Sequence, residues 1–286
     1  MKNLASPKVT REIIEKYGFR FSKSLGQNFL IDSNILDKII DGAGIHKDYG
    51  VLEIGPGIGT MTQKLAQHAH NVLAIEIDRA LLPILRETLG EYTNVQVLHG
   101  DVLKLPLKEH LRDYFGDRPI KVVANLPYYV TTSIVMKLLE EDLPLESITI
   151  LIQKEVAERM QASPGGKDYG ALSVAVQFYA QPRIIGNVPP SVFIPAPKVE
   201  STIISLDILK EPRVLVKDKK LFFAVVKAAF GKRRKTLLNA LSSSQLEIEK
   251  GKIKEVLKTA NIDATRRGET LSLEEFAHIA NSIAGE

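Results

Sequence analysis

The stretch 49–60, Tyr-Gly-Val-Leu-Glu-Ile-Gly-Pro-Gly-Ile-Gly-Thr, decides the fold. Its first six residues form a short β-rich run, and a helix is expected to follow the glycines, to about Ala69. Gly55, Gly57 and Gly59 let the backbone approach a ligand closely, with a helix N-terminus behind the loop. Their spacing differs from the G-x-G-x-x-G of pyrophosphate-binding dehydrogenases. The loop alone is compatible with a plain structural turn or with a ligand site.

The alternation of strands and helices continues along the chain. Further strands are expected at 71–77, 95–98, 120–124, 147–152 and 199–208. Helices are expected at 11–17, 32–43 (with Asp32 as N-cap), 80–89, 132–139 and 154–160. The segment 172–179 has a β-like composition that does not exclude a helix, and 188–197 is too rich in proline for regular structure. This alternation predicts an α/β sheet, largely parallel and covered on both faces.

Glycine or polar residues occur at the ends of four successive expected strands, at Gly55, Glu76, Asp101 and Asn125. Ligands on such sheets bind beyond the carboxyl ends of the strands, so we expect these residues to converge on one site. Glu76 could accept hydrogen bonds from both hydroxyls of a ribose, and Asp101 could accept one from an adenine amino group. Together with the glycine loop they predict a site for a nucleoside such as S-adenosylmethionine.

The stretch Asn125-Leu126-Pro127-Tyr128-Tyr129 supplies the second half of the expected site. The side-chain oxygen of Asn125 and a backbone carbonyl near Pro127 could accept both hydrogens of an exocyclic amine. Such acceptors favour the pyramidal nitrogen of a methyl-transfer transition state. Tyr128 could stack on a flipped-out base. Taken alone, this stretch is equally compatible with an ordinary strand-to-helix turn.

The composition is that of a globular protein with an uneven charge distribution. Hydrophobic residues make up 44% and charged residues 25%, and the absence of cysteine excludes disulfides and thiolate metal sites. No metal is expected. Residues 1–10 do not form a signal peptide, and no apolar run approaches the roughly 20 residues that span a bilayer. We therefore expect a soluble, cytoplasmic protein. We also expect a monomer, although the sequence does not fix the oligomeric state.

The end of the chain differs from the rest in charge. Residues 211–286 contain 15 Lys and Arg against 10 Asp and Glu, whereas residues 1–210 contain 23 against 24. We place a domain boundary there, giving domains 1–210 and 211–286. The second domain is expected to be helical, with helices at 221–241, 252–260 and 272–283, the last starting with a capping box.

Two segments could bind RNA. Lys232, Arg233, Arg234 and Lys235 fall within the first expected C-terminal helix. Eight basic residues against one acidic residue over 217–235 favour a phosphate-binding face over a merely solvated one. Near the N-terminus, aromatic residues alternate with Arg20 and Lys23. This segment could bind phosphate and base together, or it could be a flexible arm that packs two phenylalanines onto the main domain.

Several segments in combination resemble the ribosomal RNA adenine N6-dimethyltransferases. They are 25–30, 53–59, 125–128, 153–156, 189–193, 197–199 and 233–237. No single segment is specific, but the combination is, and it spans most of the chain. The resemblance implies a Rossmann-like class I S-adenosylmethionine-dependent methyltransferase domain, followed by a smaller all-helical C-terminal domain.

The resemblance also implies roles for individual residues. The residues that would contact S-adenosylmethionine are Asn28, Leu30, Gly55, Gly57, Glu76, Asp101 and Asn125. Asn125 would also face the target amine, beside Leu126 and Pro127, and Tyr128 and Phe193 would sandwich the adenine. Without the resemblance, the residues alone favour a different role for Phe193, as a core residue under the proline-rich loop. Basic residues would hold the rRNA. The implied reaction is two methyl transfers onto each of two adjacent adenosines near the 3′ end of small-subunit rRNA, in an immature small subunit.

Three other functions remain open from the sequence. The macrolide-resistance branch dimethylates one adenine of large-subunit rRNA with the same machinery. A ribosome-assembly factor would mainly bind an immature subunit, and the intact 125–128 stretch argues against a purely noncatalytic role. A dinucleotide oxidoreductase is disfavoured by the glycine spacing and by the lack of a proton donor near the site.

Overall fold

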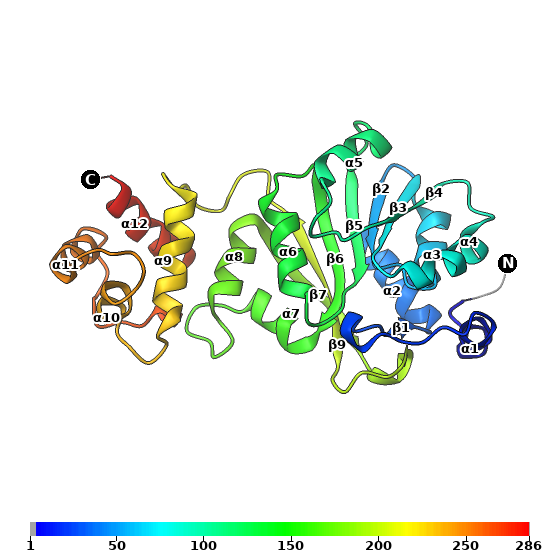
Figure 1. Cartoon of the computed structure of the whole chain (residues 1–286). Helices are drawn as coiled ribbons and strands as arrows, with labels where there is room; N and C mark the ends of the chain where they lie inside the picture. The colour runs from blue at the N-terminus through cyan, green and yellow to red at the C-terminus, as the bar shows by residue number, and fades with distance from the viewer. Residues whose placement is uncertain (1–3, 286) are drawn as a thin grey trace. The chain divides into compact units, whose positions relative to one another are not determined.

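The computed structural model describes residues 4–285, except the side chain of Lys23, and the chain packs as two compact units. The first comprises Met1–Ala157 and Arg183–Ile208, and the second comprises Glu158–Pro182 and Leu209–Glu286 (Figure 1). The observed boundary after Ile208 lies close to the expected one at 210. The segment 158–182, however, belongs to the second unit and not, as expected, to the first.

A seven-stranded sheet runs through the first unit in the order β4-β3-β2-β5-β6-β9-β7. Its strands are β2 (Gly50–Ile54), β3 (Asn71–Glu76), β4 (Val95–His99), β5 (Ile120–Asn125), β6 (Leu145–Gln153), β7 (Ala180–Val188) and β9 (Ser201–Ile208). β2 to β6 pair in parallel, and β9 pairs antiparallel with β6. The α/β class and the largely parallel sheet are thus confirmed. β7 was not anticipated, because its sequence carries a proline and a glycine within the strand.

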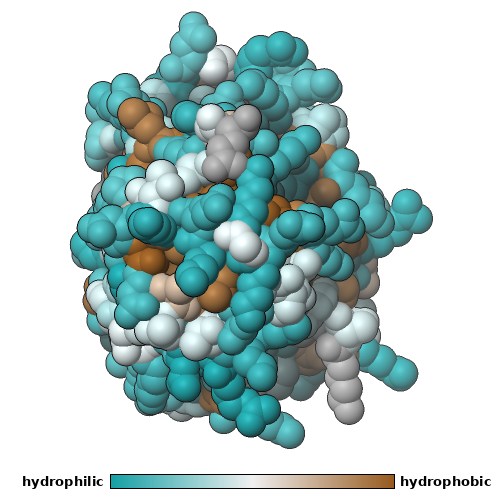
Figure 2. Space-filling model, turned by 90° about the vertical axis from the view of Figure 1, so that its left-hand side faces the viewer, coloured by the Kyte–Doolittle hydropathy of each residue, from teal (hydrophilic) through white to brown (hydrophobic). Residues whose placement is uncertain are grey.

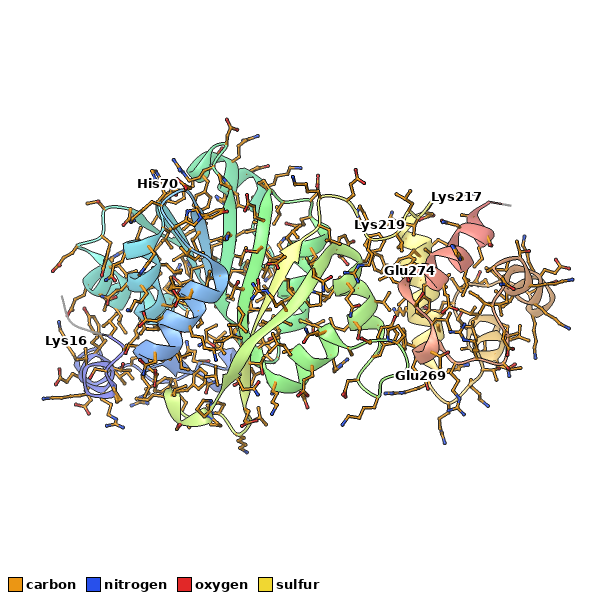
Figure 3. The ribbon with its side chains drawn as sticks, turned by 180° about the vertical axis from the view of Figure 1, so that it is seen from behind. Lys16, His70, Lys217, Lys219, Glu269 and Glu274 are labelled. Atoms are coloured by element: carbon orange, nitrogen blue, oxygen red, sulfur yellow. The ribbon has the colours of Figure 1, made fainter. Side chains whose placement is uncertain are left out.

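Helices lie on both faces of this sheet. They are α2 (Ser33–Ala43), α3 (Thr60–His68), α4 (Leu82–Leu89), α5 (Leu107–Phe115), α6 (Thr131–Glu140) and α7 (Lys154–Gln161). Three strands contribute one residue each to an apolar cluster with residues of α2 and α3: Val51 from β2, Val123 from β5 and Leu151 from β6. α6 lies in front of the sheet in Figure 1, and α2 lies in front in the reverse view of Figure 3. The helix α5 was missed by the sequence analysis.

Local sequence signals explain where these helices begin and end. The carboxylate of Asp32 accepts hydrogen bonds from the backbone N–H groups of Asn34 and Ile35, which confirms it as the N-cap of α2. Gly44 ends α2 with a left-handed φ of 57°. α1 (Pro7–Lys16) starts earlier than expected and ends at Lys16, which is labelled in Figure 3. The Nζ of Lys16 lies 2.5 Å from the Glu87 carboxylate.

The proline-rich segment is more regular than expected. It contains the 3₁₀ turn η3 (Pro190–Val192) and the short strand β8 (Phe193–Ile194). β8 pairs antiparallel with β1 (Phe29–Leu30), so backbone hydrogen bonds join segments far apart in sequence. The other 3₁₀ turns are η1 (Lys23–Leu25), η2 (Arg79–Leu81) and η4 (Gly268–Thr270).

The second unit is helical. Its helices are α8 (Ala171–Tyr179), α9 (Lys219–Gly231), α10 (Leu237–Ser242), α11 (Lys250–Thr259) and α12 (Leu273–Ala284). The segment 172–179, left open from its composition, is thus a helix, because Phe178 packs into an apolar core with Phe222 and Phe276. Ser272 and Glu275 form the predicted capping box of α12. Among the described residues, no helix is long and apolar enough to cross a membrane.

The basic run lies in a turn and not in a helix. α9 ends at Gly231, and the backbone of Lys232 is not helical, with a φ of −132° and a ψ of 66°. Thr236, with an extended backbone, precedes α10. The prediction of one helix over 221–241 was therefore wrong. A glycine, four like charges and a Thr at a helix start were the signals for a break.

Candidate active site

A pocket of about 820 Å³, including its open mouth, lies at the carboxyl ends of β2, β3 and β5. Its lining comprises residues 25–30, Glu53, residues 55–58, Thr60, Met61, Glu76, Ile77, Leu81 and residues 125–128. The structure brings Gly55, Glu76 and Asn125 together in the lining of this pocket. The arrangement follows from the parallel sheet, in which neighbouring strands end at the same edge.

Glycine is required in the loop after β2. Gly55, Gly57 and Gly59 have φ values of 70°, 60° and 91°, in the left-handed region. A Cβ on Gly57 would also lie 3.0 Å from the ring of Phe29. The loop therefore passes tightly between its neighbours and turns into the N-terminus of α3, leaving backbone N–H groups at the pocket.

Glu76 is held by the backbone at the base of the pocket. One carboxylate oxygen accepts from the N–H of Asp78 at 2.8 Å and the other from the N–H of Gly57 at 3.2 Å. Burial raises the pKa of Glu76 to about 7, and these backbone N–H groups oppose that rise. A fixed carboxylate with remaining lone pairs can accept hydrogen bonds from two vicinal hydroxyls.

Glu53 is a second carboxyl in the pocket, and the sequence analysis assigned it no role. Its side chain is fully buried, and neither oxygen has a hydrogen bond of normal geometry to a described residue. Burial raises the pKa of Glu53 to about 8; the nearby hydroxyl of Thr62 opposes the rise, and Glu76 adds to it. A charged residue inside the apolar run 51–54 was the sequence signal that could have identified it.

Because of Glu53, stability should fall as the pH rises. The folded state keeps a proton that an unfolded chain releases near pH 4.5, so the free energy of unfolding decreases from about pH 4.5 to 8 and then levels off. Glu53→Gln replaces the titrating carboxyl by an amide that stays neutral at every pH, so this pH dependence should disappear. At pH 9 the variant should be more stable than wild type by roughly 2–4 kcal/mol, and at pH 5 nearly equal. Denaturant unfolding at both pH values measures this. A difference independent of pH would contradict it.

Asp101 lines a second pocket, of about 720 Å³, which shares Leu25, Gly55, Ile77 and Pro127 with the first. One oxygen of Asp101 accepts from the N–H of Leu103 at 3.0 Å, which fixes the carboxylate. Tyr129 also lines this pocket and is 65% exposed. The four strand-end positions therefore line two pockets that have four lining residues in common.

The N-terminal segment forms one wall of the site. Gln27 donates to the Asp78 carboxylate at 2.6 Å, and the carbonyl of Asn28 accepts from Asn125 at 2.8 Å. Leu30 lies in β1 and is buried. Asn28 and Leu30 thus reach the pocket, as the resemblance implied, and the bonds made by Gln27 and the carbonyl of Asn28 were not anticipated.

The aromatic residues upstream are packed and not presented to a ligand. Phe19 is buried, and its ring lies 5.6 Å from that of Phe21 and 5.8 Å from that of Phe29. The packing alternative is therefore correct for these phenylalanines, because the apolar contacts cover them. Arg20 is exposed, and the side chain of Lys23 lies outside the described part of the structure.

The orientation of Asn125 is set by its amide. Its Nδ2 donates to the carbonyl of Asn28, so Oδ1 is the atom left to accept, and it has no partner among the described residues. The carbonyl of Pro127 accepts from the N–H of Val130 and the hydroxyl of Thr131. The carbonyl of Leu126 has no such partner within the described chain. Of the carbonyls near Pro127, that of Leu126 is therefore the free acceptor.

Phe193 does not reach either pocket. It is 3% exposed and belongs to the apolar cluster that includes Leu30, Leu36 and Val188. In this conformation the predicted sandwich is incomplete: Tyr128 lines the pocket, and Phe193 fills the core behind β1. The pairing of β8 with β1 holds Phe193 there.

The basic turn is exposed, but its four cations differ. Arg233 donates to the carbonyl of Lys167 at 2.5 Å, and Lys232 donates to the hydroxyl of Ser243 at 2.8 Å. The side chains of Arg234 and Lys235 are exposed and make no hydrogen bond or ion pair with the described residues. Figure 2 views the second unit from the side of α10–α12, where hydrophilic residues cover most of the surface.

The described residues of the site offer no cluster of metal ligands. No group of three or more His, Asp or Glu side chains in residues 4–285 could hold a metal ion. The polar groups of the pockets are instead two carboxyls at the base, the fixed Asp101, an amide oxygen and free backbone groups. This donor set suits a nucleoside with hydroxyl and amino groups.

The sheet order, the glycine loop and the pocket at the carboxyl edge define a Rossmann-like class I methyltransferase domain. The sequence model of the family described as "Ribosomal RNA adenine dimethylase" matches residues 18–280. The chain therefore belongs to the ribosomal RNA adenine dimethylase family.

Relatives and solved structures agree with this assignment. A protein of Alkaliphilus oremlandii named "Ribosomal RNA small subunit methyltransferase A" is 61% identical, over 99% of both chains. Its namesake from Clostridioides difficile is 52% identical, over 99% of this chain and 98% of its own. A dimethyladenosine transferase of Plasmodium falciparum superposes with a TM-score of 0.74 at 26% identity, covering 88% and 95%. The 23S rRNA methyltransferase ErmE gives 0.67 at 25%, covering 90% and 99%.

Proposed function

We propose that this chain transfers methyl groups from S-adenosylmethionine to N6 of two adjacent adenosines near the 3′ end of small-subunit rRNA, producing N6,N6-dimethyladenosine. The observation that carries the proposal is the pair of free acceptors, Asn125 Oδ1 and the Leu126 carbonyl, in a pocket that Glu76 and the glycine loop also line. The names of the relatives at 61% and 52% identity support the choice of the small subunit.

The polar groups of the two pockets fit S-adenosylmethionine. Glu76 would accept from the ribose hydroxyls, and Asp101 from the adenine amino group, with the wall formed by Asn28 and Leu30 alongside. The backbone at Gly55 and Gly57 leaves room for close approach. When bound, the cofactor supplies an electrophilic methyl group on a sulfonium.

Asn125 and Leu126 would act on the incoming adenine. The exocyclic nitrogen is a poor nucleophile because its lone pair is delocalised into the ring. Two acceptors for its hydrogens favour the pyramidal nitrogen, and so stabilise the transition state more than the ground state. Held in this way by Asn125 and Leu126, the amine would keep its lone pair free to attack an electrophilic methyl group, and the proton lost afterwards from the nitrogen would go to solvent.

Tyr128 would stack on the flipped-out base, a contact worth roughly 1–3 kcal/mol per base. Its ring lines the pocket on the side of Asn125. A second stacking face from Phe193, implied by family resemblance, would require β8 to leave its place beside β1. We therefore propose Tyr128 as the principal stacking residue of this conformation.

The basic turn would hold the RNA backbone. Arg234→Glu with Lys235→Glu should weaken binding of small-subunit rRNA about 10-fold or more at 0.1 M salt, because two phosphate-facing cations become anions. Gel-shift titration measures the rRNA affinity, and cofactor affinity should be unchanged. Lys254→Glu with Lys258→Glu on α11 changes the charge equally and serves as the control. If both double variants lose rRNA affinity to the same extent, the basic turn is not the specific site that holds the RNA.

Two measurements test the proposed function. Calorimetric titration should show binding of S-adenosylmethionine and none of NAD; the reverse would support an oxidoreductase. Mapping of methylated adenines after reaction with immature small subunits and with large subunits should find dimethyladenosine only in the small-subunit rRNA. Methylation of large-subunit rRNA alone would support the macrolide-resistance alternative, and RNA binding without methylation would support an assembly factor.

A further inference from the structure

The hydroxyl of Tyr128 is hydrogen-bonded to a residue 73 positions away in the sequence. The phenolic oxygen of Tyr128 lies 2.7 Å from the hydroxyl of Ser201. Ser201 is 1% exposed, and Tyr128 is half-buried. Burial raises the pKa of the Tyr128 phenol, and the bond to Ser201 opposes the rise, so the hydroxyl stays neutral at physiological pH.

The position of Ser201 is itself set by the sheet. Ser201 is the first residue of β9 and pairs with Gln153, the last residue of β6. One residue further, the N–H of Lys154 donates to the carbonyl of Glu200 at 3.1 Å, and the Lys154 ammonium lies 2.8 Å from the Glu200 carboxylate. The residues next to Ser201 and Gln153 therefore also join the two strand ends, which fixes the backbone at Ser201.

We propose that Ser201 is a positioning residue, which holds the Tyr128 ring in the orientation that stacks on the target base. With its Cα fixed after β5 and its oxygen fixed at β9, the ring keeps little freedom beyond rotation about its own axis. A free aromatic side chain would lose rotamer entropy when a base stacks on it, whereas a held ring has already lost it. The inference rests on the proposed stacking role of Tyr128.

A double-mutant cycle tests this proposal. The hydrogen bond between the hydroxyls of Tyr128 and Ser201 is called the tether below. Tyr128→Phe keeps the aromatic ring but removes the tether, and Ser201→Ala removes the tether by deleting the other hydroxyl. Each should lower kcat/KM for immature small subunits about 3- to 10-fold, with unchanged affinity for S-adenosylmethionine. The double variant should be no worse than either single variant, because both remove the same bond. Fluorescence of 2-aminopurine at the target position should be quenched less in all three.

Thr202→Val is the matched control. Thr202 is also buried in β9, and its hydroxyl donates to Asn187 at 2.9 Å, away from the pocket. It should lose stability as Ser201→Ala does but keep kcat/KM and the 2-aminopurine signal. If the losses of kcat/KM multiply in the double variant, or if Thr202→Val loses as much kcat/KM as Ser201→Ala, the hydrogen bond between Tyr128 and Ser201 does not position the ring, and the proposal is wrong. Wild-type protein that transfers no methyl group would refute the proposed function, and the tether with it.

Discussion

Asn125→Ala is expected to lower the rate of methyl transfer to rRNA about 10²- to 10³-fold, the range found when one preorganised polar group of an active site is removed. The variant loses the Oδ1 acceptor and also the Nδ2 donor to the carbonyl of Asn28. The first loss acts on the transition state, so kcat should fall. Single-turnover transfer of labelled methyl, at saturating cofactor and RNA, measures it.

Asn94→Ala is the matched control for that variant. The amide of Asn94 also donates to backbone carbonyls, those of Ala66 at 2.9 Å and His70 at 3.1 Å, but it does not line either pocket. It should reduce stability without reducing the single-turnover rate. If Asn125→Ala kept more than a tenth of the wild-type rate, the amide would not be the acceptor that the reaction needs.

Phe193→Ala should lower the free energy of unfolding by about 3–5 kcal/mol, the usual cost of removing a buried ring. Phe193 is 3% exposed and packs in the core with Leu30 and Leu36. Urea unfolding followed by circular dichroism measures the loss. The resemblance to the family implied a different role for Phe193, namely stacking on the target adenine.

Phe193→Leu separates the two roles. It keeps most of the volume and should cost less than about 1.5 kcal/mol. If the Leu variant recovers both stability and transfer rate, Phe193 acts through the core. Phe193→Ala with an unfolding free energy within 1 kcal/mol of wild type would contradict the packing seen here and favour a role at the base.

Much of the fold could be predicted because its signals are local. Strand runs ending in Gly55, Glu76 and Asn125 identify a parallel sheet, and the parallel geometry then brings those residues to one edge. Asp32 and Ser272 mark helix starts through their own hydrogen bonds. These features depend on neighbours within a few residues, so the sequence displays them.

Features that depend on distant partners were missed or wrong. α8 is helical because Phe178 packs on Phe222 of α9, and no pattern within 172–179 reveals that contact. The residues alone favoured a core role for Phe193, and the stacking role came from the resemblance; its burial is fixed by the pairing of β8 with β1. The tether from Ser201 to Tyr128 likewise depends on where β9 joins the sheet.

The most direct test of the central claim is the chemical identity of the methylated product. Purified chain, labelled S-adenosylmethionine and immature small subunits are combined, and the rRNA is digested to nucleosides for mass spectrometry. The proposed function predicts labelled N6,N6-dimethyladenosine from wild type, and the proposed role of Asn125 predicts about 10²- to 10³-fold slower formation from Asn125→Ala. Label on any other nucleoside, or equal rates for both proteins, would contradict it.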